Sequence, residues 1–183
     1  MKRIIATTGL PGSGKGIFSE VAAKYEIPVF VCGDVVREET RRRGMPLTLA
    51  NTGAVMLRIR EEEGLGVISK RLIPKIDASQ CDVAVVEGVR NLEEVEELRK
   101  HYGNVTLIAV HASPQTRFER LAERGREDTP TTWEEFESRD QRELGVGLGK
   151  AIALADEMII NEGTIEELQN VSDVLIRLVL SCE

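Results

Sequence analysis

The chain has 183 residues, of which 31 are acidic and 24 are basic, so its formal net charge is −7. This acid excess argues against a dedicated binder of nucleic acid or of an anionic membrane, because either role needs a positive surface. The length predicts one domain, and an apolar fraction of 42% is enough to bury a core.

Short runs rich in apolar residues alternate with longer stretches of helical period. Strands are expected over residues 3–8, 28–32, 82–87, 105–111 and 157–161. Their apolar residues are nearly continuous, as in strands that helices cover on both faces. A helix is expected over residues 14–25, and two or three helices over residues 34–77. The alternation predicts an α/β fold with a parallel sheet.

The second half of the chain adds three expected helices. Asn91 is placed to cap the first, which runs to Lys100 and turns Glu93, Glu94, Glu96 and Glu97 towards water. The next begins at Ser113 with Pro114 in its first position. The last covers residues 164–181, and its expected inward residues are Ile165, Leu168, Val171, Val174, Leu175 and Leu178. Between them, residues 125–149 lack a clear core pattern and are expected to form a partly helical lid.

Several features favour the cytoplasm. The longest uninterrupted apolar run, at residues 151–155, is much shorter than the roughly 20 residues that a membrane-spanning helix needs. The first apolar stretch is broken at Thr7, too early for a signal peptide. The cysteines are odd in number and widely spaced, which favours neither a disulfide framework nor a metal site: Cys32, Cys81 and Cys182.

A glycine-rich loop carries the strongest functional signal. Residues 9–16 read GLPGSGKG and lie between an expected strand and an expected helix. Gly9, Gly14 and Lys15 fill the phosphate-loop pattern, in which backbone N–H groups and the helix N-terminus face phosphate oxygens. Lys15 would reach the β- and γ-phosphates. The expected nucleotide-binding residues of the loop are Gly9, Leu10, Pro11, Gly12, Ser13, Gly14, Lys15 and Gly16.

The loop resembles that of adenylate kinases and other P-loop nucleoside monophosphate kinases. It departs from the full pattern because Gly16 stands where Ser or Thr usually offers Mg²⁺ a hydroxyl. Adenylate kinases also have Gly here but follow it with Thr, whereas this chain has Ile17. A metal would then depend on nucleotide phosphates, water and carboxylates.

Two later segments resemble the acceptor side of these kinases. Gly33, Asp34 and Arg37 match the Gly-Asp-x-x-Arg element that follows the second strand of adenylate kinases. Asp34 also matches a carboxylate that dephospho-coenzyme A kinases place near the acceptor hydroxyl. Glu87 and Arg90 are similar to the ends of the Asp-Gly-Phe-Pro-Arg element. The resemblance implies that Arg37 and Arg90 bind the acceptor and that Glu87 organises metal-bound water.

The remaining matches lie around the expected lid. Arg120 and Arg124 resemble the arginines that precede the lid, which contact the adenine and the phosphates. Arg139 and Arg142 correspond to arginines that follow it, and Arg126 lies within it. The segment ALADEMIINEG resembles the adenine-lining loop of dephospho-coenzyme A kinases through Asn161 and Gly163. Ion pairing with the local acids is the alternative reading of these arginines.

The pattern as a whole is similar to archaeal adenylate-kinase-related proteins of unassigned function. This resemblance implies a P-loop NTPase fold, a three-layer α/β/α sandwich with a five-stranded parallel sheet. It implies one kinase domain over residues 1–183, with a helical acceptor-binding region at 34–77 and a lid at 125–149. The cofactor would be Mg²⁺ with ATP or GTP, and the other ligand a small phosphorylated acceptor. The catalytic residues would be Lys15, Asp34, Arg124 and Arg139.

Two functions remain open from the sequence. The first is a phosphotransferase that moves the γ-phosphate of a nucleoside triphosphate to a nucleotide or nucleotide-like acceptor. The second is an ATPase or switch that assists a macromolecular assembly. The missing hydroxyl after Lys15 favours the second, whereas the acceptor-side arginines favour the first. A phosphate loop that binds no nucleotide is the remote third reading, and the oligomeric state is left open.

Overall fold

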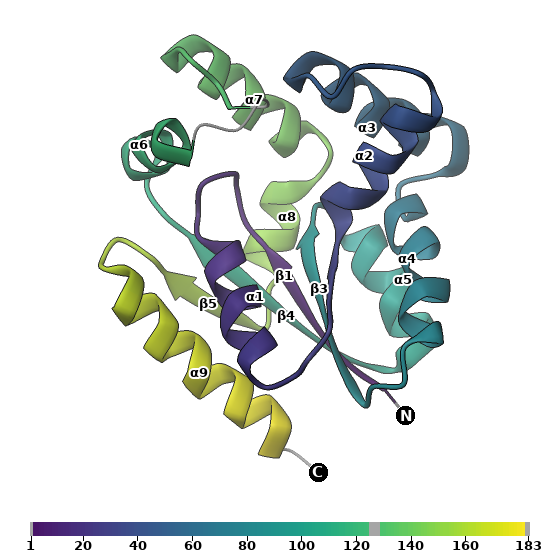
Figure 1. Ribbon diagram of the computed structural model, residues 1–183, viewed down its shortest axis with the longest axis vertical. Helices are drawn as coiled ribbons and strands as arrows, with labels where there is room; N and C mark the ends of the chain where they lie inside the picture. The colour runs from purple at the N-terminus through teal and green to yellow at the C-terminus, as the bar shows by residue number, and fades with distance from the viewer. Residues whose placement is uncertain (1, 125–128, 182–183) are drawn as a thin grey trace.

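The computed structural model describes residues 2–124 and 129–181, whose centre is a five-stranded parallel sheet (Figure 1). The strands are β1 (Arg3–Thr8), β2 (Val29–Val31), β3 (Val83–Val89), β4 (Asn104–His111) and β5 (Glu157–Ile160), in the spatial order β2-β3-β1-β4-β5. In the central register, Ile5 lies opposite Val85 on one side and Thr106 on the other. The expected parallel sheet is therefore confirmed.

Two helices cover one face of the sheet. α1 (Lys15–Lys24) follows the glycine-rich loop, and α9 (Ile165–Ser181) packs beside it. Ile5 and Ile108 point into this layer and meet Phe18 of α1 and Ile176 of α9. Since successive strand residues alternate between faces, the neighbours of Ile5 serve the opposite layer.

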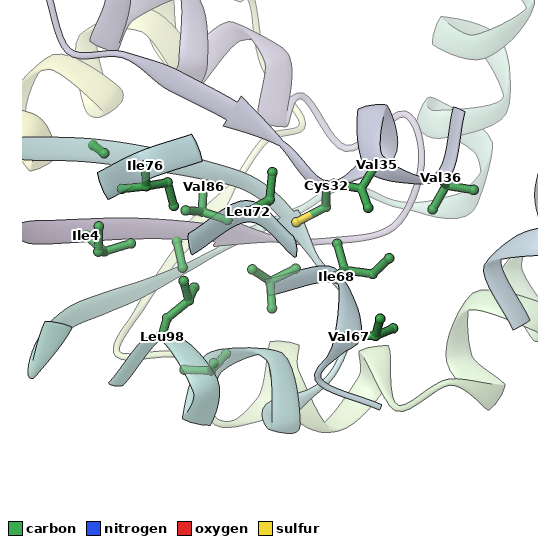
Figure 2. Packing of buried hydrophobic residues seen from close by; sticks show 14 of the residues in the cluster. Ile4, Cys32, Val35, Val36, Val67, Ile68, Leu72, Ile76, Val86 and Leu98 are labelled. Atoms are coloured by element: carbon green, nitrogen blue, oxygen red, sulfur yellow. The ribbon is translucent and has the colours of Figure 1, made fainter. Parts of the chain in front are cut away.

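A larger group of helices covers the other face. It contains α2 (Cys32–Arg42), α3 (Leu49–Glu63), α4 (Val67–Ala78), α5 (Leu92–Tyr102) and α8 (Leu148–Ala153). Figure 2 shows Ile4 and Val86 of the sheet packed among Ile68, Leu72 and Leu98 from α4 and α5. α6 (Pro114–Arg124) and α7 (Trp133–Gly145) lie with α2 and α3 at the end of the sheet where the glycine-rich loop leaves β1 (Figure 1).

Three local expectations need correction. Cys32 does not end the second strand but begins α2, where its side chain is fully buried. Glu94 does not face water: its side chain is fully buried and binds Arg60. The lid segment does contain core residues, since Phe136 of α7 and Leu148 of α8 are buried. Its residues 125–128 lie outside the described part of the chain.

The expected inward face of α9 is also partly wrong. Leu168 is buried and Leu175 is partly buried, as expected. Four other members of the expected set are largely exposed: Ile165, Val171, Val174 and Leu178. Ser172 and Ile176 take the buried positions instead. Apolar residues surround most of this helix, so periodicity alone could not decide which face meets α1.

A buried ion pair joins α3 to the start of α5. Arg60 Nη2 donates to Glu94 Oε1 at 2.5 Å, and both side chains are almost fully buried. The other oxygen, Glu94 Oε2, accepts the backbone N–H of Arg90 at 2.8 Å. Asn91 Oδ1 accepts the backbone N–H of Glu94 at 2.8 Å, which confirms Asn91 as the cap of α5. One carboxylate therefore holds α3, α5 and the segment after β3 together.

We expect Arg60→Met to lower the free energy of unfolding by about 3 kcal/mol, because it leaves the buried Glu94 carboxylate without its counter-ion. Urea unfolding followed by circular dichroism measures the change. Arg58→Met is the matched control, since Arg58 lies on the same helix and binds Glu62 at an exposed position. Exposed ion pairs contribute little to stability. Equal losses in the two variants would contradict the role given to the buried pair.

Candidate functional site

The glycine-rich loop fits tightly between β4 and α6. A Cβ atom at Gly9 would lie 2.2 Å from the carbonyl oxygen of Val110, and one at Gly12 would lie 2.6 Å from that of Arg117. Both glycines also have positive φ angles, 143° and 83°. Larger residues would therefore be strained and would clash with backbone at both positions. By contrast, a Cβ atom at Gly16 would meet nothing within 4 Å.

Lys15 points back into the loop. Its Nζ donates to the carbonyl oxygens of Gly9 at 2.6 Å and Leu10 at 3.1 Å. Burial lowers the pKa of the Lys15 ammonium to about 8, although the nearby Glu87 carboxylate works in the opposite direction. The hydroxyl of Ser13 is buried and has no hydrogen-bond partner among the described residues. The loop thus holds a cation, Lys15, that lines the cavity and that an anionic ligand could engage.

A cavity of about 160 Å³ opens next to the loop. It is lined by Gly9, Pro11, Gly12, Gly14, Lys15, Gly16, Val31, Gly33, Arg37, Glu87, Gly88, Arg90, Leu121, Thr129, Arg139 and Glu143. These residues come from the loop, α2, the end of β3 and helices α6 and α7. The structure therefore brings together the loop, both predicted acceptor arginines, Glu87 and Arg139.

Each acceptor-side arginine already binds a carboxylate. Arg37 donates to Asp34 from Nε at 3.0 Å and from Nη2 at 2.6 Å, which places Asp34 beside the cavity but not in its lining. Arg90 donates to Glu143 of α7 through Nε, and through Nη2 at 3.3 Å. An anion that binds either guanidinium therefore has to share it with a carboxylate or displace that carboxylate.

Glu143 lines the cavity but is not among the site residues expected from the sequence. Burial alone would raise the pKa of the Glu143 carboxyl, but the charge of Arg90 and its hydrogen bond outweigh burial, so the pKa is lowered. The same partner raises the pKa of Arg90 against the effect of burial. Glu143 follows the buried Phe136 by seven residues, or about two helical turns, so both lie on the same face of α7. This spacing is the signal in the sequence that Glu143 is buried.

Glu87 lies at the end of β3 and faces the start of α1. Ser19 Oγ donates to Glu87 Oε2 at 2.6 Å, which fixes the orientation of the carboxylate. Ser19 was not among the expected site residues, and it lies one helical turn beyond Lys15. Within the described residues, no group of three or more His, Cys, Asp or Glu side chains could hold a metal ion. A cation here would therefore need ligands from a bound nucleotide.

The loop after β5 contacts the glycine-rich loop directly. Asn161 Nδ2 donates to the carbonyl oxygen of Ser13 at 2.8 Å. Arg120 of α6 donates to the carbonyl oxygens of Asn161 at 3.0 Å and Gly163 at 3.3 Å. Arg120, Asn161 and Gly163, which the resemblance assigns to the adenine, are thus neighbours, although none of them lines the cavity.

Arg117 links α6, α7 and the glycine-rich loop. It is almost fully buried, binds Asp140 of α7 at 2.6 Å and stacks over the Phe136 ring at 4.9 Å. Its Nη1 also donates to the carbonyl oxygen of Pro11 at 3.3 Å. The contacts of Arg117 are therefore those of a structural ion pair that links these three elements.

The other arginines around the lid differ in position. Arg142 turns away from the cavity and packs on α3, where a Cβ atom at Gly53 would lie 2.9 Å from its guanidinium carbon. Arg124 is the last residue of α6, but its side chain lies outside the described part of the structure. Arg126 also lies outside the described residues.

Sequence comparisons find relatives along nearly the whole chain. A family model described as an AAA domain matches residues 8–137. A UPF0200 protein of Hyperthermus butylicus is 49% identical over 166 residues, which cover 91% of this chain and 89% of the relative. A UPF0200 protein of Methanocaldococcus jannaschii is 46% identical over 180 residues, which cover 97% and 91%.

Solved structures with the same fold include two kinases. A gluconokinase from Sinorhizobium meliloti has a TM-score of 0.60 and 20% identity, covering 96% of this chain and 93% of that one. A shikimate kinase from Bacteroides thetaiotaomicron has a TM-score of 0.62 and 16% identity, covering 96% and 98%. At these identities the likeness establishes the fold alone, and it confirms the P-loop NTPase fold. No helix among the described residues is long and apolar enough to cross a membrane.

Glu143→Gln should lower the free energy of unfolding by about 2 kcal/mol at neutral pH, because the buried Arg90 loses a charged partner. The pKa of Glu143 is lowered from 4.5 by folding, so its stabilising effect is fully present above that pH and is lost as the pH falls through the lowered value. The difference between wild type and variant should therefore shrink in acid. Glu137→Gln, an exposed change on the same helix, is the control. A difference that is constant with pH would refute the ion pair with Arg90.

Proposed function

The chain belongs to the UPF0200 family and contains an AAA domain, and from this premise we propose that it is a small-molecule kinase. It would move the γ-phosphate of ATP or GTP to a nucleotide or nucleotide-like acceptor. One observation carries the proposal: a single cavity is lined both by the phosphate-binding loop and by Arg37 and Arg90 from two other elements. An enzyme that only hydrolyses a nucleotide needs no second phosphate pocket.

The donor phosphates would bind at the loop of residues 9–16. Backbone N–H groups at the start of α1 and the ammonium of Lys15 would neutralise their charge. Lys15 would exchange its present carbonyl partners for phosphate oxygens. Arg120, Asn161 and Gly163 lie next to the loop and would contact the base. The resemblance to adenylate kinases implies this for Arg120, and the resemblance to dephospho-coenzyme A kinases implies it for Asn161 and Gly163.

The acceptor would bind between α2 and the segment after β3. Arg37 and Arg90 offer planar donor groups that match phosphate oxygens in a two-point contact. Glu143 now occupies Arg90, so an acceptor phosphate would displace that carboxylate or share the guanidinium with it. If the acceptor group is a hydroxyl, Asp34 is the carboxylate placed to take its proton.

The lid would complete the site from α7. Arg139 lines the cavity, and Arg124 is the last residue of α6. Phosphoryl transfer leaves little covalent work to a protein, so these groups would act by aligning the two substrates and neutralising the transferring phosphoryl group. The region of residues 125–149 would exclude water that otherwise hydrolyses the donor.

The oxygen donors around the loop fit Mg²⁺. This ion is commonly held by one or two carboxylates together with substrate phosphates and water. Glu87 offers such a carboxylate, and Ser19 holds it in place. When bound with ATP, Mg²⁺ would neutralise part of the phosphate charge. Gly16 contributes no side-chain ligand.

A second function is favoured by two observations. Gly16 offers no hydroxyl, and both acceptor-side arginines have carboxylate partners, Asp34 and Glu143. An ATPase or switch that assists a macromolecular assembly tolerates slow chemistry and needs no free acceptor pocket. A kinase turns over only when an acceptor is present, whereas an ATPase or switch hydrolyses the nucleotide without one.

We expect Arg90→Ala to reduce phosphate transfer at least about 100-fold while leaving ATP binding intact, because only the acceptor side loses a cation. The assay follows transfer from labelled ATP or GTP, with Mg²⁺, to nucleoside monophosphates and dephospho-coenzyme A. Lys15→Ala should abolish donor binding. Arg99→Ala is the control, since Arg99 binds Asp156 away from the cavity. Hydrolysis without any acceptor, unchanged in Arg37→Ala and Arg90→Ala, would establish the ATPase or switch instead.

Gly16→Ser should strengthen Mg²⁺ binding to the nucleotide complex by roughly tenfold, because it adds an oxygen ligand where the structure has open space. Calorimetric titration of the ADP complex with Mg²⁺ measures this affinity without turnover. Gly145→Ser is the matched control, since a Cβ atom there is equally unobstructed and lies outside the cavity. Equal Mg²⁺ affinity in both variants would show that position 16 does not face the metal.

A further inference from the structure

The free edge of the sheet is unusually apolar. β5 pairs with β4 on one side only and is the last strand in the sheet order. Its Met158 and Ile160 are 50% and 61% exposed, whereas Ile159 between them is buried. Edge strands that face water are normally protected by charges, proline or a covering element, because their free N–H and C=O groups can pair with another strand. β5 begins with one exposed charge, Glu157, but its apolar Met158 and Ile160 give no such protection.

An exposed apolar flank of α9 lies beside this edge. Tyr25 of α1 binds Asp173 of α9, and Arg177 Nε donates to the Tyr25 hydroxyl oxygen at 2.9 Å, so these two α9 residues mark the flank that meets α1. At about 100° of rotation per residue, Val171 and Leu178 fall on the opposite flank. α9 lies between α1 and the outer side of the molecule in Figure 1. The flank of Val171 and Leu178 therefore faces the side of the molecule on which β5 ends the sheet.

We name the exposed apolar residues on the two faces of this edge the β5–α9 surface. It consists of Leu154, Met158, Ile160, Val171, Val174 and Leu178, all of them more than two-fifths exposed. Their exposed area adds up to on the order of 600 Å² over the two faces, more than singly scattered surface apolar residues would give. About 800 Å² per partner is the size of a standard protein interface.

We propose that the β5–α9 surface is the contact between two copies of this chain, related by a two-fold axis. The two β5 strands would pair antiparallel at their free edges and extend the sheet across both copies. An antiparallel pair of identical strands is self-complementary, as a two-fold contact requires. This proposal rests on no part of the proposed catalytic function.

The backbone of β5 fixes the register of that pairing. The N–H of Asn161 donates to the carbonyl oxygen of His111 at 2.7 Å, the bond that a regular parallel ladder requires when Ile160 pairs with His111, so Ile159 and Asn161 direct their backbone groups to β4. Met158 and Ile160 alternate with them, and their N–H and C=O groups point to the free edge. Met158 of one copy would therefore exchange both hydrogen bonds with Ile160 of the other, and Ile159 would lie opposite itself in a pair without hydrogen bonds.

This register also matches the exposed side chains. With Ile159 opposite itself, Met158 of one copy lies opposite Ile160 of the other, twice, on the same face of the extended sheet. On the other face, the flanks of α9 that carry Val171, Val174 and Leu178 approach each other across the axis. Both apolar groups are then covered by their own equivalents. A net charge of −7 makes an anionic lipid surface an unfavourable occupant.

Analytical ultracentrifugation of the purified chain tests the proposal over a range of protein concentrations. The wild type should sediment with the mass of two chains. Ile160→Lys and Val174→Glu each place a charge in the contact and should shift the mass to that of one chain. Both side chains are exposed, so the circular dichroism of the variants should stay unchanged. Leu65→Lys is the matched control, an exposed leucine between α3 and α4 that should leave the dimer intact.

Three results would overturn the proposal. A wild type that sediments as one chain at every concentration leaves the surface to a different protein or to solvent. A dimer that persists in both charged variants uses another surface. A dimer lost equally in Leu65→Lys reflects a general effect of added charge. If one charged variant fails to fold, the other still decides, because Ile160 and Val174 lie on different elements.

Discussion

Charge buried inside a protein needs a partner of opposite sign, and this requirement shapes the end of the sheet where the cavity lies. Three ion pairs meet it there: Arg60 with Glu94, Arg90 with Glu143, and Arg117 with Asp140. Each pair joins separate elements. Helices α3, α5, α6 and α7 are therefore fixed around the glycine-rich loop by charge pairing as well as by apolar contact.

The pairs also determine how the cavity can receive a polyanion. A chain with an excess of acids has gathered Lys15, Arg37, Arg90 and Arg139 around a small volume. The carboxylates of Asp34 and Glu143, beside Arg37 and Arg90, balance part of this positive charge. The same carboxylates compete with an anionic ligand for the arginines, so the need to displace them weakens ligand binding. Such a site favours ligands that supply several anionic groups at once.

Local signals predicted most of the fold, and the phosphate-binding loop with it. The strands carry near-continuous apolar runs, and the glycines of the loop and the cap at Asn91 work through neighbours in sequence. The expectations that proved wrong concern residues whose contacts lie far away in the sequence. In the sequence, Glu94 looks like the three other acids of its helix, and only its contact with Arg60 explains why it is buried. Glu143 meets Arg90 across 53 residues, and the buried face of α9 depends on where α1 lies. No pattern within one helix contains that information.

Arg117 has a thermodynamic consequence. One guanidinium binds both the Pro11 carbonyl oxygen of the glycine-rich loop and the Asp140 carboxylate of α7. A movement of α7 therefore changes the hydrogen bonding of the loop. In turn, a ligand that makes the loop more rigid restricts the motion of α7. Occupancy at the two ends of the cavity is then linked by a coupling free energy that must be equal in both directions. Arg117 is the side chain through which such a linkage would pass, because it touches both elements.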